Sequence, residues 1–333
     1  MEASLENPKY SAYLVTGGGS KYNITNVLEN LSLTEGENSL AQKCDFTIAN
    51  IKTKSGLMSG IVDIAHKIYV YADTGSGKKE VFRGTIWTRK YNSADEKVLP
   101  CVAYDHLIYA ENSEDTFYFP AGKSTRSIFS TICGKWGIKL NYKFASITHP
   151  KQTNQLQKKY ISDMFLELLK EVKKQNGQKY IIRSANDTMT VSQRGTNGTI
   201  YHFVSKQNVE QTTSSRTLSG VITQVAITGK EDKEGRSPVE AIVKGQTGAY
   251  GTLQAIIERK EGTTLAEAKQ EAQELINENG KPFESFSING IDCPWVRKGD
   301  KISVSAGDLS GTFYVVSVDH DAKKKKMRME VER

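Results

Sequence analysis

A strand–turn–strand block occurs twice in this chain. It begins with Lys-Ile-x-Val-x-Ala at 67–72 and again at 301–306. In each copy a Gly-rich turn leads to a second apolar strand, over 81–87 and 312–318. A polar turn and a third strand follow, over 98–104 and 327–331. Alternating apolar and polar residues between such turns are typical of half-buried strands. The shared order predicts two similar β domains in one chain.

Length and composition favour a folded protein of several domains. The 333 residues are enough for two or three hydrophobic cores, and 25% charged residues with many aromatic residues argue against global disorder. No apolar run approaches ~18 residues, so we expect no membrane-spanning helix. The N-terminus, Met1 to Asn7, lacks the basic start and apolar core of a signal peptide. The sequence therefore predicts a protein made in a cytoplasm and leaving it by lysis.

The middle of the chain changes to a helical period. Ser124 or Thr125 can cap a helix that ends at Gly137, and a second amphipathic helix is predicted from about Ser162 to Asn176, before Gly177. Two short strands follow, over 179–183 and 189–192, joined by an Asn-Asp turn. We interpret 119–208 as a small α+β domain.

The strongest helix signal lies near the second copy of the block. Thr264 and Glu267 have the spacing of a capping box, in which each side chain satisfies a free backbone N–H, and Gly280 suits the end of this helix, 264–279. The predicted fold is α+β and mainly β, with two β-barrel domains and the small α+β domain between them. We expect the helix to cover the barrel of its own domain. Its first β domain spans 1–118, which residues near 205–230 could complete, and its second spans 209–333.

Each segment that resembles a catalytic or cofactor-binding motif lacks residues that the motif requires. Thr74 to Lys78 resembles a phosphate-binding loop, but Ala72 and Lys79 stand where Gly and Ser or Thr are needed, which favours a hairpin turn. The run Asp319-His320-Asp321 has no accompanying nucleophile and is interpreted as a polar hairpin shoulder. The four cysteines show no metal-ligand or disulfide spacing. We predict no enzyme, no cofactor and no metal site.

The net charge of +7 comes largely from 151–183, which holds eight Lys or Arg against three acids. The lysines lie on the polar side of the predicted helix over 162–176, and a nucleic-acid site would need exposed aromatics among them. A solvated helix face is therefore favoured over specific nucleic-acid binding, while a polyanion or an acidic partner surface stays open.

The order of weak motifs along most of the chain resembles one family. The C-terminal stretch runs from the helix through Phe286 to Gly290, then Val296 to Ile302, then Phe313 to His320. This resembles the end of baseplate hub proteins of contractile phage tails and phage-tail-like bacteriocins, the late-control-D and XkdQ/YqbQ-like group. Arg297-Lys298 replaces the Pro often found there before Gly-Asp. Upstream features agree, namely Phe82-Arg83-Gly84, Tyr104-Asp105, Trp136-Gly137 and the run 223–229.

The resemblance implies a structural role. Members look like trimeric hubs whose chains each carry two domains similar to the tail-tube subunit, so that three chains present a pseudo-sixfold ring between a hexameric tube and a trimeric spike. It implies a homotrimer that contacts the tube and spike proteins, with tape-measure, sheath or wedge proteins as further partners. The location implied is the baseplate of a virion or a tail-like particle.

Closed rings need matching side-by-side surfaces, and exposed strand edges can supply them. We predict that the first strand of each block forms the ring interface, with these residues on it: Ile68, Val70, Ala72, Ile302, Val304 and Ala306. Two alternatives from other classes remain open at this stage. One is a peptidoglycan hydrolase of a tail particle whose carboxylates are distant in sequence, and the other is a carbohydrate-binding β module.

Overall fold

The computed structural model describes residues 8–144, 147–149, 158–231 and 235–333, so the N-terminal residues Met1 to Asn7 and the lysine at 151 lie outside the described residues. The fold is mainly β, with a few helices, as predicted. The chain divides into two compact units. Unit 1 holds residues 1–213 and 287–333, and unit 2 holds residues 214–286. The stretch 209–333, expected to be one domain, is therefore divided between them.

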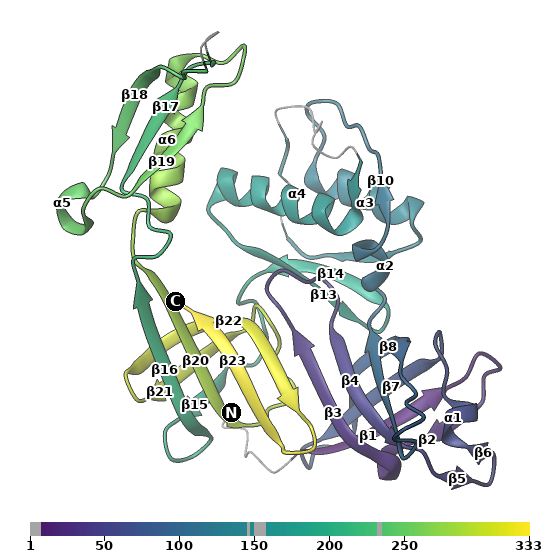
Figure 1. Ribbon diagram of the computed structural model, residues 1–333. Coiled ribbons are helices and arrows are strands. Elements are labelled where there is room, and N and C mark those ends of the chain that lie inside the picture. The colour runs from purple at the N-terminus through teal and green to yellow at the C-terminus, as the bar shows by residue number, and fades with distance from the viewer. Residues whose placement is uncertain (1–7, 145–146, 150–157, 232–234) are drawn as a thin grey trace. The chain divides into compact units, whose positions relative to one another are not determined.

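One large sheet of 13 strands forms the framework of unit 1 (Figure 1). Its hydrogen-bonded path runs β16 (Val209–Thr217), β20 (Phe283–Ile291), β23 (Lys326–Glu332), β22 (Leu309–Asp321), β3 (Leu28–Glu35), β4 (Lys43–Ala49), β9 (Val98–Tyr104), β8 (Lys79–Arg89), β7 (Lys67–Asp73), β1 (Lys9–Val15) and β2 (Lys21–Asn23). Off this path, β21 (Lys301–Ala306) pairs with β22 and with β15 (Tyr201–Val204).

The two sequence blocks form the same three-stranded meander. We call β7–β8–β9 the first repeat and β21–β22–β23 the second repeat. In the first, Lys67 lies opposite Thr85, which lies opposite Tyr104. In the second, Lys301 lies opposite Tyr314, which lies opposite Glu332. The two copies of Lys-Ile-x-Val-x-Ala thus occupy the same register.

A bulge marks the same point of both repeats. Between the second and third strands the register shifts over Ile86–Thr88 in one repeat and over Val315–Ser317 in the other. Because a bulge inserts one residue and bends its strand, it is a specific structural feature. Its recurrence at matching positions supports a true structural repeat.

The turn that enters each repeat is also shared. Ala65 and Gly299 both have a left-handed backbone, with φ of 64° and 81°. The Ala65 N–H donates to the Ile86 carbonyl at 2.9 Å, and the Gly299 N–H donates to the Val315 carbonyl at 2.6 Å. A left-handed backbone disfavours Ala, which occupies this position in the first repeat only.

Each repeat is extended by one further strand on its third-strand side. The Asn50 N–H donates to the Lys97 carbonyl, just before β9, and the Asp292 N–H donates to the Lys325 carbonyl, just before β23. Thus β4 and β20 hold equivalent places. Beyond them lie β3 and β16, which are again equivalent in the order of strands. Among the described residues, no pairing closes either half into the expected barrel.

The α+β module predicted for 119–208 contains its expected elements. Helix α3 (Thr125–Lys135) begins at Ser124, whose side chain accepts from the Ser127 N–H, and α4 (Ile161–Asn176) ends at left-handed Gly177. Strands β11 (Lys139–Tyr142), β14 (Thr188–Gln193) and β13 (Tyr180–Ala185) form a small sheet with the helices over it (Figure 1). Phe129 of α3 stacks on Phe165 of α4 in their common core.

The remaining short elements of unit 1 lie in the connections. They are η1 (Thr25–Val27), β5 (Lys52–Thr53), β6 (Gly56–Leu57), α1 (Met58–Ile61), α2 (Ile108–Glu111), β10 (Glu114–Asp115) and β12 (Lys159–Tyr160).

Unit 2 is a three-stranded sheet with one long helix. Its strands are β18 (Val239–Lys244), β17 (Gln224–Thr228) and β19 (Gln254–Glu258), and α5 (Thr247–Tyr250) lies between β18 and β19. Helix α6 (Leu265–Asn279) begins with the predicted capping box of Thr264 and Glu267. Its buried face, Ala268, Ala272 and Ile276, packs on β17 and β18. The expectation that this helix covers the second repeat's barrel is therefore wrong, because it covers the sheet of its own unit.

Candidate interaction site: the joint between the two repeats

The two repeats are joined side by side in one sheet. The last part of β22 pairs with β3 in antiparallel register, from Val318 opposite Glu35 to Asp321 opposite Ser32. The Thr34 hydroxyl donates to Asp319 at 3.1 Å, and the Ala322 N–H donates to the Leu31 carbonyl. We call this strand pair, together with the turn 296–300 that lies against β3, the inter-repeat joint.

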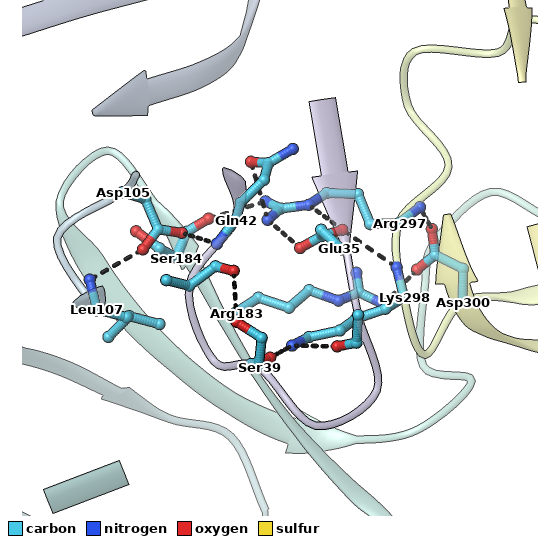
Figure 2. A network of polar contacts seen from close by, with 12 residues as sticks. Glu35, Ser39, Gln42, Asp105, Leu107, Arg183, Ser184, Arg297, Lys298 and Asp300 are labelled. Carbon is cyan, nitrogen blue, oxygen red and sulfur yellow. Dashed lines mark hydrogen bonds and ion pairs between the residues drawn. The ribbon is translucent and has the colours of Figure 1, made fainter. Parts of the chain in front are cut away.

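A buried ion pair lies at the centre of the joint (Figure 2). Glu35, at the end of β3, accepts two bonds from the Arg297 guanidinium, at 3.0 Å from Nε and 2.5 Å from Nη2. The Glu35 side chain is 2% exposed. Arg297 also donates from Nη1 to the Ser184 carbonyl at 2.8 Å. A two-pronged Arg–carboxylate contact fixes orientation as well as charge, so it sets how the repeats meet.

Lys298 continues the same contact with backbone oxygens. Its N–H donates to Glu35 at 3.2 Å, and its Nζ donates to the carbonyls of Gly36 and Ser39. Its neighbour Asp300 accepts from the Arg297 N–H at 2.9 Å and from Arg183 Nη2 at 2.7 Å. The turn before β21 is therefore fixed both to the β3–β4 hairpin and to β13 of the α+β module.

Glu35 and Arg297 hold each other ionised. Burial by itself raises the pKa of Glu35. The charges of Arg297, Lys298 and Arg183 together lower it by more than burial raises it, and the resulting pKa is about 2. Burial lowers the pKa of Arg297, yet the Glu35 carboxylate raises it overall. A buried carboxylate paired in this way stays charged at neutral pH, and removing one partner leaves an uncompensated buried charge.

Asp105 connects the β3–β4 hairpin to the segment that follows β9. It accepts from the Gln42 N–H at 3.0 Å and from the Leu107 N–H at 2.9 Å (Figure 2). Burial raises the pKa of Asp105 to about 7 in spite of these bonds. The carboxyl therefore organises the bend between β9 and α2.

A second buried contact crosses between the repeats. The Tyr10 hydroxyl of β1 donates to Asp292 at 2.5 Å, and the same carboxylate lies 2.7 Å from Nδ1 of His320. The other ring nitrogen, Nε2, lies 3.0 Å from the Val296 carbonyl. Burial alone lowers the pKa of His320, but these two acceptors raise it overall. Asp319-His320-Asp321, predicted as a polar shoulder, is thus part of the joint, with a buried histidine.

The predicted ring-interface residues lie in the hydrophobic cores. All six are buried: Ile68, Val70, Ala72, Ile302, Val304 and Ala306. Strand β7 pairs with β1 and β8, and β21 pairs with β22 and β15. The expectation that these strands offer exposed edges is wrong, because their backbone groups are already paired on both sides. The sequence pattern showed neither β1 nor β15 as a partner.

The glycine-rich segment at 74–78 is a hairpin turn, as predicted. It connects β7 to β8, and the Asp73 carboxylate accepts from the N–H groups of Gly75 and Gly77 at 2.9 and 3.1 Å. These are the donors that a phosphate would need, and a side chain of the same turn occupies them.

Sequence reasoning missed the joint itself. Glu35 is 262 residues from Arg297, and no spacing rule connects them. One sequence feature could have indicated the joint. Two basic residues, Arg297-Lys298, stand before Gly-Asp where the resembled family often has Pro. No group of three or more His, Cys, Asp or Glu that could hold a metal ion occurs among the described residues. No helix in the described ranges is long and apolar enough to span a membrane.

Comparison with known proteins decides the family. The family model described as YQBQ-like matches residues 31–332, which is nearly the whole chain. The chain belongs to the YQBQ-like family. This YQBQ-like chain is also 21% identical over 254 residues to the uncharacterized protein YqbQ of Bacillus subtilis strain 168, covering 74% of each.

Solved structures share the fold of this YQBQ-like protein. A tail protein from Neisseria meningitidis MC58 matches with a TM-score of 0.69 at 11% identity, over 97% of this chain and 96% of that one. The 43 kDa tail protein of prophage MuSo2 from Shewanella oneidensis matches with a TM-score of 0.69 at 14% identity, over 98% of each. The E. coli c3393 protein, described as a type VI secretion component similar to the T4 tail proteins gp27 and gp5, matches at 0.53 and 10% identity, over 91% and 73%. The fold is that of phage tail proteins.

Proposed function

We propose that this protein is a structural component of a contractile tail's baseplate, the hub that joins the tail tube to the spike. Three copies form a ring in which the two repeats of each chain alternate, so that three chains present six similar positions. The observation that carries the proposal is the inter-repeat joint, in which two repeats of equal register lie edge to edge through β3 and β22. A side-by-side contact between like parts is heterologous, and such contacts form a ring when the rotation from one part to the next closes on itself.

The relatives support this role. The similar solved structures carry the names of tail proteins, and c3393 is named as similar to tail proteins of T4. The proposed partners are two further copies of the chain, a tube protein and a spike protein, with tape-measure, sheath or wedge proteins around them. The place is the baseplate of a virion or tail-like particle, assembled in the bacterial cytoplasm and released by lysis. We propose no catalytic role.

Labelling of intact tails tests the proposal. An epitope inserted in an exposed turn, such as 323–325 between β22 and β23, marks the chain for electron microscopy of particles from a producing strain. We expect label at the distal end of the tube only. Particles without label, or label along the tube, would contradict a hub. Release of muropeptides from purified cell wall by the isolated protein would instead support the hydrolase alternative.

A further inference from the structure

The two repeats differ in what lies against their entry turns. The turn Arg297-Lys298 of the second repeat is fixed against β3, as described above. The same positions of the first repeat hold Asp63 and Ile64, and both are exposed. The local backbone is nevertheless the same, because the Asp63 N–H donates to His66 at 3.2 Å as the Arg297 N–H donates to Asp300 at 2.9 Å. The first repeat therefore has the joint's turn without the joint's partner.

The strand edge next to this turn is also unpaired. The pairing of β8 with β7 ends at Thr85, whereas its pairing with β9 continues to Arg89. Counted from the shared bulge, residues 89–92 correspond to residues 318–321 of β22, which pair with β3. On the side that faces away from β9, no strand in the described part of the chain pairs with residues 89–92. An unpaired edge of this kind is a template for another strand.

The second repeat has the complementary feature. Strand β16 holds the place of β3, and it ends the path of the sheet. One side pairs with β20, and no strand of the described residues runs along the other. Strands β3 and β16 each begin with a buried residue, Leu28 and Val209, which is followed by two exposed residues. The rest of β3 is largely buried, whereas the rest of β16 is largely exposed. The first repeat thus offers the free edge of β8, and the second repeat offers the outer edge of β16, along which no strand of the described residues runs.

Large exposed side chains occur in and next to the segments that flank the free edge of β8. Ile64 is 57% exposed, and it precedes Ala65, which is bonded to Ile86. The bulge residue Trp87, 38% exposed, lies edge-on against Tyr109, 48% exposed, with ring centroids 5.4 Å apart. Tyr91, 48% exposed, follows β8, and its hydroxyl donates to Glu96 at 2.7 Å. An exposed aromatic pair such as Trp87–Tyr109 is typical of a protein interface.

We infer that residues 89–92 of one copy pair with the outer edge of β16 of a second copy of this chain. This pairing repeats between chains the β22–β3 pairing within the chain. It covers the exposed cluster, by which we mean the side chains of Ile64, Trp87, Tyr91 and Tyr109 on the segments that flank this edge. The inference rests on the proposed ring, and it names the strands that close it. The free edge of β8 needs a strand equivalent to β3, which pairs with β22. Among the residues that the structure describes, the strand equivalent to β3 is β16 of the second repeat, so we take the occupant to be β16 of a second copy.

Disulfide trapping locates the interface. Cysteine replaces Tyr91 in one position and Thr213, Ser214 or Ser215 in the other, and each double variant is oxidised. The four native cysteines are buried, so they offer no competing thiol. We expect chains linked in twos and threes, with one of the three β16 positions linking best. The double variant Tyr118→Cys with Ser214→Cys is the matched control, because Tyr118 is exposed but lies outside the cluster.

Charge substitution provides the second measurement. We expect Trp87→Lys to dissociate the assembly into single chains with unchanged circular dichroism, whereas Tyr118→Lys leaves it intact. A trimer that survives Trp87→Lys and gives no links through Tyr91→Cys would overturn this interface while leaving the proposed ring standing. A wild-type chain that stays monomeric at high concentration would overturn both.

Discussion

The entry turns of the two repeats have the same backbone conformation, but their side chains lie in different surroundings. One carries Arg297 and Lys298 into a buried ionic contact, and the other leaves Asp63 and Ile64 exposed. Because the register, the bulge and the left-handed residue are common to both, the difference comes from side chains and neighbours. It teaches that one strand arrangement can serve an internal joint and an external surface.

The largest expected effect lies in the ion pair. Arg297→Ala leaves the Glu35 carboxylate buried without its partner, which costs about 3–5 kcal/mol of unfolding free energy. The matched change at the first repeat, Asp63→Ala, removes an exposed side chain and should stay within about 0.5 kcal/mol. Urea unfolding of both variants measures the difference. Equal effects would show that the two turns are not energetically distinct.

Acid should weaken the joint through Glu35. Its pKa in the folded protein is about 2, below the usual value, so its contribution is fully present above the unfolded pKa and is lost as the pH falls toward 2. The shift from the reference pKa corresponds to about 3 kcal/mol. The gap in unfolding free energy between the wild type and Glu35→Gln should narrow by about that amount from pH 7 to pH 2. A gap that does not change with pH would refute this role of the carboxylate.

A smaller effect is expected at the left-handed residue. A Cβ at Gly299 would lie 2.4 Å from Ile181, so Gly299→Ala should cost about 1–3 kcal/mol through crowding and backbone strain. Ala65→Gly, the reverse change at the matching position, should alter stability by less than about 1 kcal/mol. Thermal unfolding of the two variants makes the comparison. A larger loss at Ala65 would show that the first repeat's turn is the more constrained one.

The smallest effect concerns the hydroxyl that crosses between the repeats. Tyr10→Phe removes the donor to buried Asp292 and should cost about 1 kcal/mol. Tyr13→Phe, on the same strand, is the control, because its ring rests on Tyr71 through an edge contact that Phe preserves. Denaturant midpoints measure both. If the two changes cost the same, the Asp292 contact does not stabilise the joint.

Local signals in the sequence predicted local structure well. Ser124 and Thr264 begin their helices with the bonds that their side chains suggested, and the repeated Lys-Ile-x-Val-x-Ala marks equivalent strands. These features depend on neighbours within a few residues, so periodicity and capping chemistry reveal them.

Features that depend on distant partners were not predictable in the same way. Strands β1 and β15 cover the expected free edges, and Glu35 meets Arg297 across most of the chain. Residues 214–286 form a separate unit, although the sequence analysis assigned them to the second β domain. The sequence pattern indicates where strands and helices occur, but it does not indicate which sheet each strand joins. The placement of candidate interface residues failed for this reason. The presence of two like strand blocks was predicted correctly, but their closure into barrels is not found among the described residues.

The central claim is that two repeats per chain let three chains form a ring. Native mass spectrometry of the purified protein tests it most directly. We expect a species of three times the 37.0 kDa chain, which Trp87→Lys reduces to single chains. A wild-type protein that stays at 37.0 kDa at every concentration, or that forms only closed dimers, would contradict it.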